Sequence, residues 1–191
     1  MIRFSITAIV CALWCSAAAA ESGKAWGTDR PNGPDRDAVP TLAKLSALQD
    51  AVAEVWQKMP LTQRRAVFVS ARPESYGIYD ERKNNIFKTG EKIITYVEPV
   101  GYTWTANADG TYDYGIAVDF LVKRSDGKVL GGQEKLLNFA KKSRVRNQEL
   151  MLVLSLSLDA IEPGEYLIEY TLHDEQSSKE SKFTQNFTIE R

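Results

Sequence analysis

The feature that most constrains this chain is a repeated alternation of apolar and polar residues after Pro60. Successive side chains of a strand point to opposite faces of a sheet, so alternation with a period of two predicts strands with one buried face. No second helical period lies between these segments, so the sequence predicts an all-β fold: an antiparallel, immunoglobulin-like β-sandwich of about 7–8 strands. The alternating segments are residues 65–71, 92–98, 112–122, 150–158, 166–172 and 183–189.

Turn signals separate these segments. Asp-Gly pairs at Asp109-Gly110 and Asp126-Gly127 are typical of tight hairpins, and Pro163-Gly164 precedes another alternating segment. We find no internal repeat and no second pattern that would mark a further domain. Residues 60–191 are therefore predicted to form one β-sandwich domain.

An amphipathic helix is predicted ahead of the sandwich, over residues 41–59. Apolar residues recur there at spacings of three and four, and Pro60 ends the pattern. Such a helix can pack on its own domain, or it can bind a partner or a second copy of the chain. The sequence leaves both possibilities open.

The first 40 residues have the composition of targeting and linker segments. Residues 1–20 combine Arg3, a short apolar run and a final Ala-Ala-Ala, which predicts a signal peptide cleaved near Ala20 and a periplasmic or secreted protein. Lipid attachment at Cys15 is disfavoured because Trp14, rather than a small residue, precedes it. Residues 21–40, rich in Gly, Pro and charge, are predicted to be a flexible tether. After cleavage we expect no membrane span.

A short motif resembles a known sandwich corner. The stretch LSLDAIEPGEYLIEY, which ends at Tyr170, is similar to the corner of fibronectin type III and other immunoglobulin-like domains. This resemblance implies that the Tyr166 hydroxyl bonds back to the preceding connection. A longer pattern, GIYDER, FKTGEKIITYVEPVGY, DGKVLGGQE and PGEYLIEYTLHD, is similar to exported bacterial β-sandwich proteins and implies no particular activity.

Few residues could carry catalysis. The chain has one histidine, His173, and both cysteines, Cys11 and Cys15, lie in the segment predicted to be removed. No zinc-protease, serine-hydrolase or phosphate-loop motif is present. We therefore predict no cofactor, no metal site and no enzyme activity. An acid-dependent hydrolase stays open as a third choice, because 25 acidic residues offer carboxylate pairs, for example among Glu98, Asp113 and Asp119.

An aromatic group lies beside the first hairpin. Tyr102 and Trp104 precede it, and Tyr112 and Tyr114 follow it. Rings on a sheet surface stack on sugars, so Tyr102 and Trp104 are candidates for a carbohydrate-binding surface. The core is the favoured alternative for both rings, and Tyr112 and Tyr114 share the alternation of core residues.

Two polar segments are further candidates for binding a partner. Lys141, Lys142, Arg144 and Arg146 form a basic segment, which could bind an anionic envelope polymer or could be a solvated connection between strands. The segment from Ser75 to Asn85 contains tyrosines and an arginine, residue types that are frequent in interface hot spots. Its candidate residues are Tyr76, Tyr79 and Arg82.

The sequence as a whole predicts a non-catalytic, exported module that binds a protein or an envelope component. The formal charge of the chain is −1, which gives no general attraction to nucleic acid. The alternatives are a carbohydrate-binding module that uses Trp104 and, third, the small hydrolase. Self-association through residues 41–59 is a further expectation.

Overall fold

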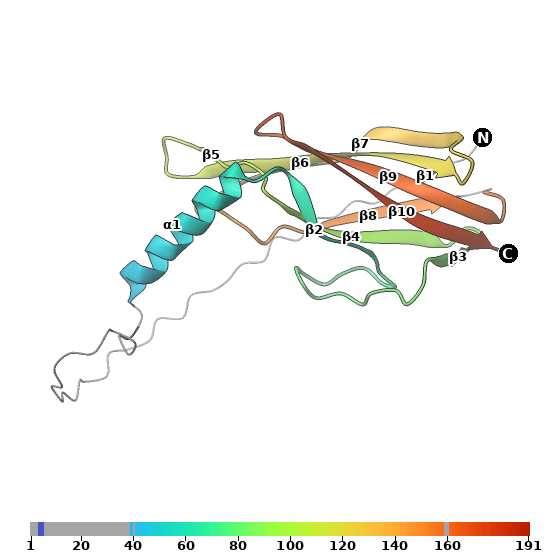
Figure 1. Ribbon diagram of the computed structural model, residues 1–191, viewed down its shortest axis with the longest axis horizontal. Coiled ribbons are helices and arrows are strands. Elements are labelled where there is room, and N and C mark those ends of the chain that lie inside the picture. Colours follow the sequence, from blue (N-terminus) through green and yellow to red (C-terminus); the bar gives the residue numbers. More distant parts are fainter. Residues whose placement is uncertain (1–3, 6–38, 40, 159–160) are drawn as a thin grey trace.

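The computed structural model describes residues 4–5, 39, 41–158 and 161–191, so most of the predicted signal peptide and tether lie outside the described residues. Within the described part the fold is all-β with one preceding helix, as predicted (Figure 1). The elements are β1 (Phe4–Ser5), α1 (Leu42–Lys58), β2 (Thr62–Phe68), β3 (Ile86–Lys88), β4 (Lys92–Val100), β5 (Thr105–Ala106), β6 (Tyr112–Arg124), β7 (Val129–Ser143), β8 (Leu152–Leu158), β9 (Gly164–Asp174) and β10 (Glu180–Glu190).

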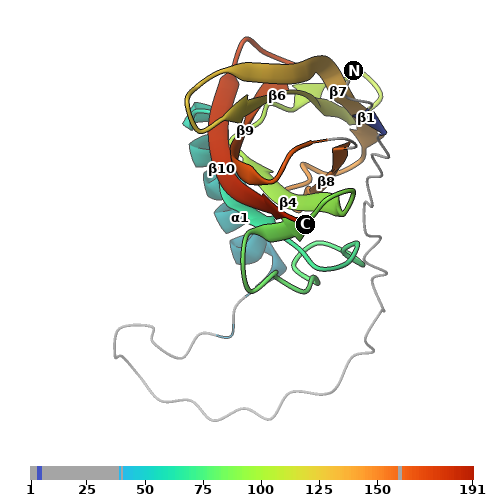
Figure 2. The ribbon, with the colours of Figure 1, turned by 90° about the vertical axis from the view of Figure 1, so that its right-hand side faces the viewer.

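The strands form two sheets. One has the order β1-β8-β4-β2, and the other has the order β3-β10-β9-β6-β5, with β7 paired to the other side of β6. All these pairs are antiparallel except β3 with β10, which is parallel. The larger sheet curls over the smaller one into a half-barrel (Figure 2), so the prediction of a plain sandwich needs correction. At the side where β10 meets β2, Gln185 Nε2 donates to the Ala66 carbonyl at 3.3 Å.

The core fills the space between the two sheets. Strand β6 contributes the alternate residues predicted from the sequence, and from Tyr114 to Val122 these side chains are buried. Strand β8 differs from its prediction, because nearly all of it is buried on both faces. Its outer face packs in a second apolar cluster with Val69 and Tyr96, under the segment that leads from β2 to β3.

Strand β7 was not predicted as a strand. It pairs along β6 with two irregularities of register, between Val118 and Phe120 and between Val122 and Lys123. Such bulges, together with Gly131-Gly132, break the alternation that would have revealed it. Gly132 is needed at this crossing because a Cβ there would lie 2.4 Å from the Phe120 carbonyl oxygen.

The corner before β9 has the hydrogen bond expected of Tyr166. Its hydroxyl donates to the Glu162 carbonyl at 2.6 Å, and the ring is buried and stacks on Phe187. This bond fixes the local turn. The fibronectin resemblance itself stays a prediction.

Candidate functional site

The most unusual surface of the described chain is the outer face of α1. Five large aliphatic side chains, which we call the α1 apolar stripe, are between 49% and 79% exposed. Apolar side chains gain free energy when they leave water, so a continuous exposed stripe is typical of an interaction surface. The stripe consists of Leu42, Leu45, Leu48, Val52 and Val55.

A shallow groove lies at the end of α1 nearest the sheets. Its volume is about 400 Å³. Its walls are mostly apolar, and Arg64 of β2 supplies the one charged side chain among them. The lining residues are Leu48, Ala51, Val52, Val55, Trp56, Met59 and Arg64. The stripe therefore continues into a hollow that can receive apolar side chains.

A few contacts hold the C-terminal half of α1 on the domain. Ala53 and Trp56 are its only buried residues. The Trp56 ring stacks on Trp104 with a centroid distance of 5.3 Å, and its Nε1 donates to the Tyr102 carbonyl at 2.9 Å. Figure 1 shows the other half of the helix extending away from the sheets.

Two charged contacts reinforce this attachment. Lys179, in the hairpin between β9 and β10, donates from Nζ to the Gln57 carbonyl (2.9 Å) and the Gly101 carbonyl (2.7 Å). A cation at the C-terminus of a helix is favourable because the last carbonyls carry a partial negative charge. Arg146, after β7, forms an ion pair with Asp50 on the helix. These contacts orient α1 and leave its apolar stripe uncovered.

The aromatic surface predicted at Tyr102 and Trp104 needs correction. Tyr102 is 0% exposed and Trp104 is 4% exposed, so neither ring offers a face to a sugar. Both rings donate to the Asn147 carbonyl, from the Tyr102 hydroxyl at 2.7 Å and from Trp104 Nε1 at 2.9 Å. They form the base on which Trp56 sits, because β5 and the preceding segment turn them under the helix.

The basic segment is not one continuous charged surface. Lys141 and Lys142 lie in β7, so the prediction that they belong to a connection between strands was wrong. Arg144 and Arg146 follow the strand. Lys142 lies 3.9 Å from Asp109, and Arg146 forms an ion pair with Asp50. Among the described strands, β7 pairs with β6 alone, and charged residues on such an edge hinder pairing with another chain.

The segment between β2 and β3 lies against the outer face of the smaller sheet. Tyr76 and Tyr79 are half-buried there, and the Tyr79 ring stacks on Tyr96 at 4.1 Å between centroids. Glu98 is buried and accepts a hydrogen bond from the Tyr96 hydroxyl at 2.7 Å. Burial, followed by the Glu98 charge, raises the pKa of Tyr76. Tyr76 and Tyr79 pack on the cluster around Tyr96 and fasten the segment to the sheet.

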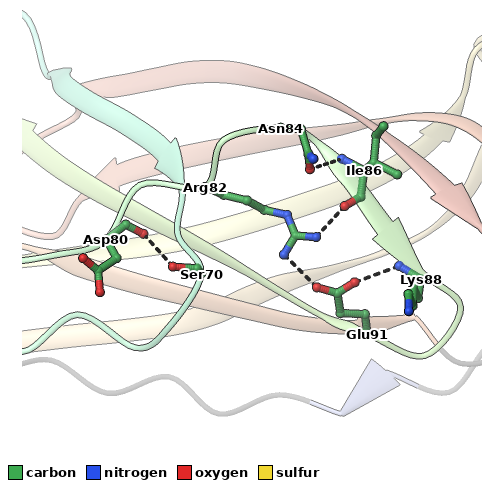
Figure 3. Close-up of polar contacts among 7 residues, drawn as sticks. All are labelled: Ser70, Asp80, Arg82, Asn84, Ile86, Lys88 and Glu91. Atoms are coloured by element: carbon green, nitrogen blue, oxygen red, sulfur yellow. Dashed lines mark hydrogen bonds and ion pairs between the residues drawn. The ribbon is translucent and has the colours of Figure 1, made fainter.

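Arg82 fastens the same segment at its far end (Figure 3). Its guanidinium contacts Glu91 at 2.7 Å, donates to the Ile86 carbonyl and lies over the Phe87 ring at 4.2 Å. Burial acts to raise the pKa of Glu91, but hydrogen bonds from the Lys88 amide and Arg82 hold it below its ordinary value. Arg82 is thus engaged within the domain, and Tyr76, Tyr79 and Arg82 together serve as fastenings of the segment.

His173 lies on the outer surface of the larger sheet. Its Nε2 is 2.7 Å from Asp119, and its Nδ1 is 3.4 Å from Glu180. Asp119 also accepts from the Lys135 amide at 2.7 Å. Burial acts to raise the pKa of Asp119, but the Lys135 and His173 hydrogen bonds keep it low. Among the contacts described for His173, none is with a hydroxyl nucleophile.

Two further observations limit the chemistry of the described residues. They contain no group of three or more His, Cys, Asp or Glu side chains that could hold a metal ion. No helix among them has both the length and the apolar character needed to cross a bilayer.

Sequence reasoning found the helix but not which of its residues form a surface. Ala53 and Val55 point about 160° apart at ~100° per residue, so the apolar residues of α1 cover more than one packing face. The wide angular spread of apolar residues around α1 was the sequence signal for a second, exposed face. The alternation of β4 places Tyr96 and Glu98 on one face, whereas the influence of Glu98 on Tyr76 had no sequence signal because the two residues lie far apart along the chain.

The comparisons with known proteins identify no family for this chain. No protein-family model and no curated protein matches the chain. Among solved structures, a family 123 glycoside hydrolase from Clostridium perfringens, described in terms of glycolipid glycan hydrolysis, matches with a TM-score of 0.44 and 8% sequence identity. The match covers 70% of this chain but only 28% of the hydrolase, so the chain is similar to less than a third of that protein.

Proposed function

We propose that this chain is a non-catalytic protein-binding module whose docking surface is the α1 apolar stripe. The observation that carries the proposal is the exposure of five large aliphatic residues on one face of a helix whose described contacts with the domain begin at Asp50. Among the other candidate residues, the aromatic ones are buried or half-buried, and Arg82 and Arg146 are engaged in ion pairs within the domain. The stripe gathers five exposed large aliphatic side chains on one face of a single helix.

The chemistry of the helix favours a protein partner over a charged polymer. Lys44 and Lys58 balance Asp50 and Glu54, so α1 carries no formal net charge. A protein groove or helix can cover such a face by burying apolar side chains at spacings of three and four. The predicted signal peptide adds the expectation that this binding takes place in the periplasm or outside the cell.

A capture experiment with matched variants tests the proposal. Immobilised protein is exposed to an envelope extract, and capture is compared between the unchanged chain and Leu48→Glu/Val52→Glu. Loss of defined captured proteins, with an unchanged circular dichroism spectrum and urea midpoint, is expected. Glu54→Gln, at the polar side of the same helix, is the control and should leave capture intact. Equal capture by the stripe variant and the unchanged chain would overturn the proposal.

A further inference from the structure

We infer that the partner of the α1 apolar stripe is a second copy of this chain, bound through an antiparallel pair of α1 helices. This inference rests on the proposed docking role of the stripe and names its occupant. The helix has two different halves that complement each other. Its distal half presents leucines, and its proximal half borders the groove.

The distal half supplies the side chains that protrude. Leu42 is 79% exposed, Leu45 is 50% exposed and Leu48 is 58% exposed. The proximal half supplies the hollow, whose walls include Ala51, Val55 and Met59. A twofold axis perpendicular to the helices places the leucines of each copy against the groove of the other. A surface that complements itself in this way is what an isologous dimer requires.

The spacing of the stripe allows one such register for four of its five residues. With the axis level with Asp50, Leu45 of one copy lies opposite Val55 of the other, and Leu48 lies opposite Val52. Each pair occurs twice, so four apolar layers form along the helix. This is the interlocking that residues spaced by three and four produce between two helices. A parallel pair would align equal halves and leave both grooves without the protruding leucines.

Charge and area are consistent with a reversible dimer. The balanced charges of α1 create no net repulsion between copies, whereas a helix that binds anionic lipid is typically rich in Lys and Arg. Four side chains that each bury roughly 80 Å² give about 320 Å² per copy. Standard stable interfaces bury about 800 Å² per partner. We therefore expect dissociation in the micromolar range.

Sedimentation equilibrium of the full chain, with Cys11→Ser and Cys15→Ser, tests the stoichiometry. The expected result is a mass that rises from monomer to dimer with concentration, and Leu48→Glu/Val52→Glu should weaken the dimer at least about 100-fold. Glu54→Gln should leave it unchanged. A monomer at every concentration would overturn the inference, and the capture experiment would then still decide whether the stripe binds another protein. A dimer that persists in the stripe variant would equally overturn it.

Cysteine cross-linking in the same background tests the orientation. Residues 45 and 55 are about 15 Å apart along a helix, well beyond disulfide reach. An antiparallel pair therefore predicts disulfides in a mixture of Leu45→Cys and Val55→Cys chains, and few in either variant alone. Disulfides in Leu45→Cys alone would show a parallel pair and overturn the inference. Binding to phosphatidylglycerol vesicles by a monomeric chain, lost in the stripe variant, would assign the stripe to lipid and overturn it as well.

Discussion

At the scale of single residues, the segment EPVGYTW shows how close contacts set residue identity. Gly101 has φ of +79°, and a Cβ there would lie 2.3 Å from the Pro60 carbonyl oxygen. The chain must make this turn to carry Tyr102 and Trp104 from the end of β4 to a position beneath α1. The glycine is thus required by the attachment of the helix.

Substitution of this glycine provides a prediction with a matched control. Gly101→Ala should lower the free energy of unfolding by roughly 2–4 kcal/mol, because it adds a backbone clash to the cost of a left-handed residue. Gly90 has φ of +78° with no atom within 4 Å of the added Cβ. Gly90→Ala should therefore cost only about 1–2 kcal/mol. Urea denaturation measures both, and equal effects would contradict the role of the Pro60 contact.

Trp56 provides a second prediction at this scale. It is 4% exposed, stacks on Trp104 and donates to the Tyr102 carbonyl. Trp56→Ala should cost about 3–5 kcal/mol through the cavity that it leaves. Trp56→Phe keeps much of the packing but removes the donor, so its cost should be smaller, about 1–3 kcal/mol. If the two variants are equally stable in urea, the ring packing has been overestimated.

At the scale of elements, α1 spans Leu42–Lys58, and the first and last residues of the predicted helix, Thr41 and Met59, are its caps. Thr41 caps its N-terminus by accepting from the Lys44 amide at 3.2 Å, and Pro60 follows its C-cap at Met59. Its position on the domain depends on other elements: the segment after β4, the hairpin between β9 and β10, and the residues after β7. No local pattern in residues 41–59 encodes these contacts.

The hairpin contact predicts a stability effect located in the helix. Lys179→Met removes a charged donor from the Gln57 and Gly101 carbonyls, and we expect a loss of about 1–2 kcal/mol. Hydrogen exchange should accelerate most in the last turn of α1. Lys182→Met, on β10, is the control; its side chain is 61% exposed and should change stability by less than about 0.5 kcal/mol. A uniform acceleration of hydrogen exchange across the domain would contradict a local role of Lys179 in holding α1.

At the scale of the whole molecule, acidic residues link stability to pH. The pKa values of Asp119 and Glu91 are lower in the folded protein than their ordinary values, because each carboxylate accepts hydrogen bonds from backbone and cationic groups despite its burial. A lowered folded pKa gives stability that is present above the unfolded pKa, about 4 for these groups. That stability is lost as pH falls through the folded pKa.

The corresponding prediction concerns the acid limb of the stability profile. Asp119→Asn should reduce the free energy of unfolding at pH 7 and approach the unchanged chain as pH falls below about 4. Urea denaturation at several pH values measures the difference between the two proteins. Asp80→Asn, at an exposed position, is the control. The difference in free energy of unfolding between this variant and the unchanged chain should stay constant with pH. A difference for Asp119→Asn that persists undiminished at low pH would contradict the linkage.

Much of the fold could be predicted because alternation and helical spacing are local properties. The strands around β4, β6, β8, β9 and β10 and the helix 41–59 follow from residues that are close in sequence. Strand β7 was not predicted because bulges and glycines break its alternation. The curl of the larger sheet follows from how its strands twist together. Local patterns contain neither kind of information.

The candidate site divides in the same way. By itself, the sequence determined that residues 41–59 form an amphipathic helix, that the chain has cysteines only at positions 11 and 15, and that sheets follow the helix. Only the tertiary structure decided that Trp104 is buried beneath Trp56 and that Leu45, Leu48, Val52 and Val55 stay exposed. The physical reason is that periodicity identifies apolar faces, whereas burial depends on surfaces that arrive from distant parts of the chain. Here those surfaces cover one side of α1 and leave the other side to a partner.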